Sequence, residues 1–175
     1  MPAPLLGQGR AIDLLNTVWA DRSGSHDELG DAALARRWAG TALTDHGAAT
    51  LRELRDAARV LAADRTGDPR TVAAGHREPA AEAAATVNAV SALSPRWPVL
   101  SEGRLDSASD AGDEERLLGD LAGDAVRLLA HGADLRACLA PSCVLYFVKD
   151  HPRREWCSTT CGNRARAARH YARHR

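Results

Sequence analysis

Residues 138–161 read CLAPSCVLYFVKDHPRREWCSTTC and contain all four cysteines of the 175-residue chain. Their spacing is C-x4-C, then thirteen residues, then C-x3-C. Two close pairs separated by a short spacer suit the corners of a tetrahedral zinc site. Four thiolates leave no open coordination position, so we expect a structural ion and no zinc hydrolase chemistry. The predicted ligands of this one Zn²⁺ are Cys138, Cys143, Cys157 and Cys161.

Two other uses of the cysteines stay open as alternatives. A pair of disulfides would require an oxidising compartment, and nothing in the sequence indicates export. A redox-active dithiol is typical of C-x-x-C spacing, which neither pair has. Zinc binding therefore remains the leading interpretation, with both cysteine pairs at one site.

The segments between the cysteines predict a treble-clef-like unit, a hairpin followed by a helix. Residues 144–148 are rich in β-formers, 149–152 indicate a turn, and 153–156 would return as the second strand. Ser158 is a suitable N-cap for a helix from 158 to 175, with Cys161 in its first turn. Gly162 would allow the backbone to approach the metal closely, and Asn163 would form a local hydrogen bond.

The predicted last helix has two different sides at 100° per residue. Its apolar side could pack on the hairpin and consists of Ala165, Ala168, Tyr171 and Ala172. Its basic side suits phosphate oxygens and consists of Arg166, Arg169, His170 and Arg173. We expect Arg153 and Arg164 to add to a DNA-binding surface. Arg164 lies near the apolar side, and with Arg153 and Arg154 it could also neutralise the zinc–thiolate centre.

Charge is divided unevenly along a chain whose net charge is zero. Residues 138–175 contain 8 basic and 2 acidic residues, a net charge of +6, which residues 1–137 balance with −6. A basic end on an acidic body favours a polyanionic partner, with DNA our leading expectation and RNA left open. The alternative is a zinc-stapled protein-interaction module that docks on an acidic partner, or on its own body, without binding nucleic acid.

The first three-quarters of the chain predict a mainly α body. Alanine supplies 35 residues and aromatic residues are only 4% of the sequence, which favours close-packed helices. A small hairpin is expected over 97–106, and Gly67–Pro79 indicates a loop. Apolar spacing and capping residues predict helices over Gly9–Arg22, Asp27–Gly40, Thr44–Arg65, Pro79–Leu93 and Asp113–His131.

The stretch W-C-S-T-T-C-G-N-R, residues 156–164, resembles the CGNR zinc-finger family. That likeness runs from about Leu135 to the C-terminus, and the early Asp13-Leu14-Leu15-Asn16-Thr17 is similar to the opening of the ABATE domain found in such proteins. The resemblance implies a bacterial stress-response transcription regulator. It further implies an ABATE-like sensor or dimerisation domain over residues 1–132 and a DNA-binding CGNR finger over 133–175.

Other function classes find less support in the sequence. We expect no enzyme, because G-x-S-x-G, a phosphate loop and H-E-x-x-H are all missing. No apolar run approaches the ~18 residues of a membrane span, and the N-terminus lacks the features of a signal peptide, so we expect a cytoplasmic protein. A homodimer is possible. A small-molecule pocket in the body would be lined by Asp13, Asn16, Trp19 and Trp38.

Overall fold

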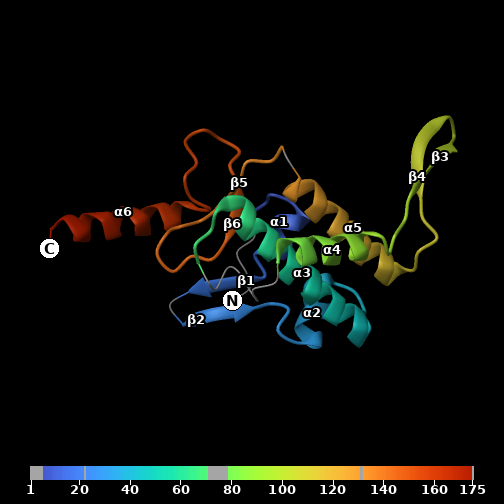
Figure 1. The fold of residues 1–175 in the computed structure, drawn as a ribbon, viewed down its shortest axis with the longest axis horizontal. Coiled ribbons are helices and arrows are strands. Elements are labelled where there is room, and N and C mark those ends of the chain that lie inside the picture. The colour runs from blue at the N-terminus through green and yellow to red at the C-terminus, as the bar shows by residue number, and fades with distance from the viewer. Residues whose placement is uncertain (1–5, 22, 71–78, 131, 175) are drawn as a thin grey trace.

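The computed structural model describes residues 6–21, 23–70, 79–130 and 132–174, which form six helices and three antiparallel hairpins (Figure 1). The body contains α1 (Arg10–Leu15), β1 (Val18–Asp21), β2 (Gly24–Asp27), α2 (Ala32–Ala39), α3 (Asp45–Thr66), α4 (Ala80–Ser91), β3 (Trp97–Ser101), β4 (Arg104–Ala108) and α5 (Asp113–Leu129). The C-terminal unit contains β5 (Leu135–Ala137), β6 (Tyr146–Val148) and α6 (Thr159–Arg173). The mainly α fold and the treble-clef-like end confirm the sequence-based fold class.

Helix α3 is the centre of the body. It packs against α1, α2, α4 and α5, and it also contacts β5 of the C-terminal unit. Small side chains on this helix let its neighbours approach closely, which explains how a chain with few aromatic residues forms a dense core. The alanines of α3 that are almost fully buried are Ala48, Ala57, Ala58 and Ala62.

The ends of the long helices follow the predicted capping residues. Thr44 caps α3, because its hydroxyl accepts a hydrogen bond from the Gly47 N–H at 2.9 Å. The carboxylate of Glu114 on α5 binds the same threonine through its N–H at 2.6 Å and its hydroxyl at 2.9 Å, which ties α5 to α3. The predictions of α3, α4 and α5 are confirmed to within a few residues. The expected loop segment 71–78, and the expected helix ends at Arg22, His131 and Arg175, lie outside the described residues.

The first two helices are shorter than the sequence predicted. The first ends at Leu15, and residues 18–21 and 24–27, predicted mostly as helix, instead form the strands of the β1–β2 hairpin, in which Trp19 pairs with His26. The apolar spacing from Ile12 to Trp19 suited a helix, but Trp19 is buried against the C-terminal unit instead. The second helix begins only at Ala32, where the Asp31 carboxylate accepts a hydrogen bond from the Leu34 N–H at 2.8 Å.

The hairpin of the C-terminal unit uses a different strand from the one predicted. Strand β6 does form within 144–148, but it pairs with the upstream β5, in the register Arg136 with Phe147. Residues 153–156 form no strand, and the Arg154 N–H donates to the His151 carbonyl in a turn. The predicted pairing is therefore wrong. The first cysteine pair consequently lies in the connection between the two strands, and the second pair lies at the start of α6.

Two elements extend away from this assembly at opposite ends. Helix α6 leaves the cysteine-bearing unit in one direction, and the β3–β4 hairpin leaves the ends of α4 and α5 in the other (Figure 1). The hairpin confirms the prediction over 97–106. The apolar side of α6 does not pack on the hairpin as expected, because only Ala165 is buried and Tyr171 is 72% exposed.

Candidate metal centre

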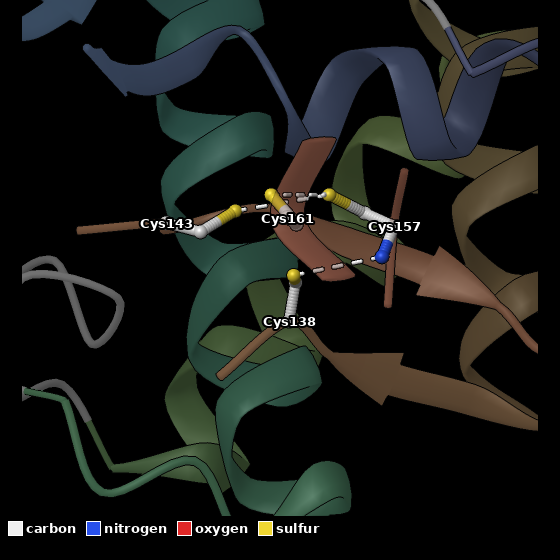
Figure 2. A group of neighbouring side chains, drawn as sticks. All are labelled: Cys138, Cys143, Cys157 and Cys161. Carbon is white, nitrogen blue, oxygen red and sulfur yellow. Dashed lines mark hydrogen bonds between the residues drawn. The ribbon is translucent and has the colours of Figure 1, made fainter. Parts of the chain in front are cut away.

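The four cysteine side chains converge on one point from separate segments of the chain. Figure 2 shows their sulfurs pointing toward one another, and all four sulfurs lie within 4.8 Å of one another. The Sγ–Sγ distance is 3.8 Å between Cys143 and Cys157 and 3.5 Å between Cys157 and Cys161. A disulfide bond measures about 2.05 Å, whereas a zinc ion with bonds of about 2.3 Å implies edges of about 3.8 Å. The geometry therefore fits one tetrahedral Zn²⁺.

The electrostatics of the cluster also fit a bound cation. Hydrogen bonding with Cys143 lowers the pKa of the Cys138 thiol to about 2, and the Cys157 N–H lies 3.5 Å from the same sulfur. Hydrogen bonding with Cys138 raises the pKa of Cys143 to about 12 and also raises the pKa of Cys157. Buried sulfurs this close cannot all carry negative charge without a counterion. A divalent cation lets all four bind as thiolates and makes the site structural.

The residues after the last cysteine support the site. The Arg164 guanidinium donates to the Cys161 sulfur at 3.0 Å, and this hydrogen bond raises the pKa of Arg164. The expected structural role of Arg164 is therefore correct. Gly162 is buried, and a Cβ there would lie 3.1 Å from the Trp156 ring, so the glycine also gives this indole room. Asn163 forms the expected local bond, accepting from Arg166 at 2.6 Å.

Comparison with protein families agrees with this geometry. The model of the CGNR zinc finger matches residues 135–174. The model of the ABATE family, described as "Putative stress-induced transcription regulator", matches residues 9–132, more than half of the chain. The chain belongs to the ABATE family. The resemblance predicted from the sequence is thereby confirmed for both segments. A comparison with curated proteins found no match.

The ABATE body and the CGNR finger are joined by two amide side chains that act like an extra strand. Asn16 donates to the Tyr146 carbonyl at 2.9 Å and accepts from the Tyr146 N–H at 2.8 Å. Gln8 repeats the pattern two residues along β6, donating to the Val148 carbonyl at 2.6 Å and accepting from its N–H at 3.0 Å. The edge of β6 that β5 does not cover is thus satisfied by the body.

Two arginines of α3 are buried, and the sequence prediction missed both; Arg59 contacts the finger, whereas Arg55 binds residues of the body. Arg59 is 2% exposed; it donates to the carbonyls of Leu15 and Val144, and its guanidinium lies 5.3 Å from the Tyr146 ring centroid. Burial lowers the pKa of Arg59. One turn earlier on α3, Arg55 is also buried and bonds Asp27 at 2.7 Å. The available signal was two arginines one turn apart beside an apolar stripe.

A second buried network reaches the cysteine loop itself. Arg70 donates to the carbonyls of Cys138, at 2.7 Å, and of Cys143. Its guanidinium is held by the buried carboxylate of Asp68 at 2.6 Å, which also accepts a hydrogen bond from the Tyr146 hydroxyl at 3.0 Å. These contacts fix the first metal-binding loop of the CGNR finger onto the end of α3.

The four residues predicted to line a ligand pocket occupy separate places in the ABATE protein. Asn16 bonds β6, and Trp19 packs in the cluster that contains the four cysteines. Trp38 packs against the main core of the body. Burial raises the pKa of Asp13, whose Oδ1 is buried without a hydrogen-bond partner among the described residues.

The predicted DNA-contacting residues divide into structural and exposed groups. Arg164 faces the metal site, and Arg153 lies exposed in the turn before it. Arg154, expected to help neutralise the metal, instead pairs with Asp150 at 2.7 Å and donates to the Cys157 carbonyl at 3.0 Å. The rest line one hollow of about 380 Å³ on α6: Arg166, Arg169, His170 and Arg173, joined by His174. No described helix is both long and apolar enough to cross a membrane.

Proposed function

We propose that this protein is a transcription regulator that binds duplex DNA through α6 of its CGNR finger. The single observation that carries the proposal is the hollow on α6, which is lined only by arginine and histidine side chains. Forked guanidinium donors suit phosphate oxygens, and their number and spacing favour contacts with the backbone over reading of bases.

The way α6 is held supports this proposal. The zinc site anchors only its first turns, where the Ser158 hydroxyl accepts a hydrogen bond from the Cys161 N–H at 3.2 Å. Every residue from Arg166 to His174 is exposed. The basic half of the helix therefore extends clear of the body, where it can approach a duplex without a rearrangement of the fold (Figure 1).

The arginines on the exposed part of α6 also form no ion pairs with the acidic body among the described residues. Within the part of the chain that the structure describes, no ion pair joins Arg166, Arg169 or Arg173 to a carboxylate. Arg166 bonds the Asn163 amide, and Arg169 bonds the Ala165 carbonyl at 3.4 Å. Among the described residues, no ion pair therefore supports docking of α6 on the body of the same chain, which is the intramolecular form of the protein-interaction alternative.

Fluorescence anisotropy with the zinc-loaded full chain tests the proposal. Four phosphate contacts predict that log affinity for duplex DNA falls with log salt at a slope of about −3 to −4. Arg169→Ala and Arg173→Ala should each reduce the magnitude of the slope by about 1, uniformly across DNA sequences. Arg37→Ala, an exposed arginine on α2, is the matched control and should change neither slope nor affinity.

The competing interpretations are separate outcomes of the same titration. Tighter binding to RNA than to DNA of equal length would show that RNA, and not DNA, is the preferred partner. Binding that is absent at low salt, or unaffected by ionic strength, would contradict nucleic-acid binding and favour the protein-interaction module.

A further inference from the structure

The β3–β4 hairpin, residues 97–108 and here called the arm, is an exposed element with no core beneath its tip. Its two-residue turn has both central residues in the left-handed region, Glu102 at φ 51° and Gly103 at φ 76°. That turn type suits a tight hairpin, so the sequence specifies the arm strongly. An isolated two-stranded hairpin is nonetheless only marginally stable in water. A partner packed against the arm would therefore stabilise it.

The base of the arm is fixed to the body. The Arg96 guanidinium forms a bidentate ion pair with Asp120 of α5, with distances of 2.7 and 2.8 Å. Ser94 is buried and lies so close to Gly119 of α5 that a Cβ on that glycine would clash with it. Its hydroxyl lies 3.2 Å from that of Ser109, across the arm's two ends. The arm is therefore held in one direction, away from the body (Figure 1).

The tip of the arm presents an apolar projection. Leu100 and Leu105 face each other across the two strands, so their side chains lie on the same face. They are 82% and 83% exposed, the highest exposures among the large apolar side chains of the described residues. Single exposed leucines are common on protein surfaces, but an opposed pair at the end of a projecting hairpin marks an interaction site.

A shallow hollow lies on the same element. It measures about 490 Å³, large enough for a leucine side chain, and Pro98 and Ser107 place it on the same face as Leu100. Its lining combines apolar surface with one cation and one anion: Arg96, Trp97, Pro98, Leu105, Asp106 and Ser107. A projection and a matching hollow on one element are the condition for a two-fold symmetric, self-complementary interface.

Strand addition along the arm is a less suitable mode of contact. Pro98 has no N–H to donate, and the N–H of Ser107, which faces it across the hairpin, already donates to the Asp106 carboxylate at 2.7 Å. Proline and occupied donors on exposed strands are the usual protection against edge-to-edge pairing. The side-chain face, rather than the backbone edge, is the surface left for a partner.

We propose that the arm is a dimerisation element whose partner is the arm of a second copy of this chain. Two arms lie antiparallel about a two-fold axis, and the Leu100 tip of each enters the hollow beside Pro98 and Ser107 of the other, which lie on the same face as Leu100. This arrangement brings the tip of one arm to the base of the other. The charges are complementary there, because Glu102 at one tip approaches Arg96 at the other base, whose side chain stays 42% exposed beside Asp120.

The inference is independent of nucleic-acid binding and is tested without it. Sedimentation velocity of the zinc-loaded full chain from about 1 to about 200 µM should show a monomer–dimer equilibrium, since one small arm offers less than a standard interface. Leu100→Ser should weaken the dimer about tenfold or more. Leu139→Ser, a leucine 56% exposed on the CGNR finger, is the matched control and should change the dissociation constant less than about twofold.

Mixing two variants distinguishes this interface from any other. Leu100→Ser lacks the projection and Ser107→Trp fills the hollow, so neither forms a complete contact with itself. A mixture keeps one intact contact of the two and should associate more tightly than either variant alone. Unchanged zinc content and circular dichroism establish that the variants are folded. A monomer at every concentration, a Leu100→Ser protein that dimerises like the parent, or a mixture no tighter than its components would overturn the proposal.

Discussion

Replacement of Asn16 by alanine tests how the ABATE body holds the CGNR finger. Asn16 is 1% exposed and Tyr146 is fully buried, so water does not reach the two hydrogen bonds that join them. The substitution leaves the buried N–H and carbonyl of Tyr146 without partners on that side.

The magnitude follows from those two groups. A buried backbone group that loses its partner costs about 1–3 kcal/mol, so the loss of two partners in Asn16→Ala should lower the free energy of unfolding by roughly 2–6 kcal/mol. Gln8 makes the equivalent bonds to Val148 but is only half-buried, so water can replace its amide in part. Gln8→Ala should therefore cost less than Asn16→Ala.

Urea denaturation of the zinc-loaded protein measures the loss, and the rate of zinc transfer to a chelator measures its effect on the finger. Because β6 follows the first cysteine pair, a loosened Tyr146 should speed zinc release. The matched control is Asn88→Ala, an asparagine exposed on α4, which should change stability by less than about 0.5 kcal/mol. If Asn16→Ala were as stable as the control, with zinc transferred at the parent rate, the amide bridge would not be holding the finger.

Three further predictions concern the metal, the packing and the pH dependence. Purified protein should contain one zinc per chain, and a chelator should make all four thiols reactive toward a thiol reagent; thiols that stay unreactive would indicate disulfides. Gly123→Ala on α5, where the added Cβ meets only ordinary contacts, should raise stability by about 0.5–1 kcal/mol. Gly162→Ala should gain less, because its Cβ would lie 3.1 Å from the Trp156 ring; equal gains in urea denaturation would contradict the close packing. Burial raises the pKa of Asp27, but the hydrogen bonds from Arg55 and from the Leu29 N–H, together with the charges of Arg55 and Arg52, outweigh burial and hold the pKa below its usual value. The carboxylate therefore stabilises the fold at neutral pH, and the deficit of Asp27→Asn in urea should shrink as the pH falls below about 4; a deficit independent of pH would refute this.

Local signals in the sequence predicted the parts of the fold that are determined locally. Thr44 and Ser158 each cap a helix through their own hydroxyl, so the starts of α3 and α6 could be located from a few neighbouring residues. The Glu102-Gly103 turn similarly fixed the arm. The prediction failed at Val18–Asp21, because its apolar residues fit helical and strand spacing alike, and burial of Trp19 against the finger decides between them.

The chain order of the cysteines determined the metal, its coordination number and its structural character, because two closely spaced pairs bring four thiolates to one ion whatever surrounds them. Only the tertiary structure decided which strand pairs with β6, which arginines are buried and which reach solvent. Arg59 and Arg169 have the same chemistry, yet one lies beneath the finger and the other on a free helix. That difference arises from packing between segments far apart in the chain, which the spacing within one segment does not determine.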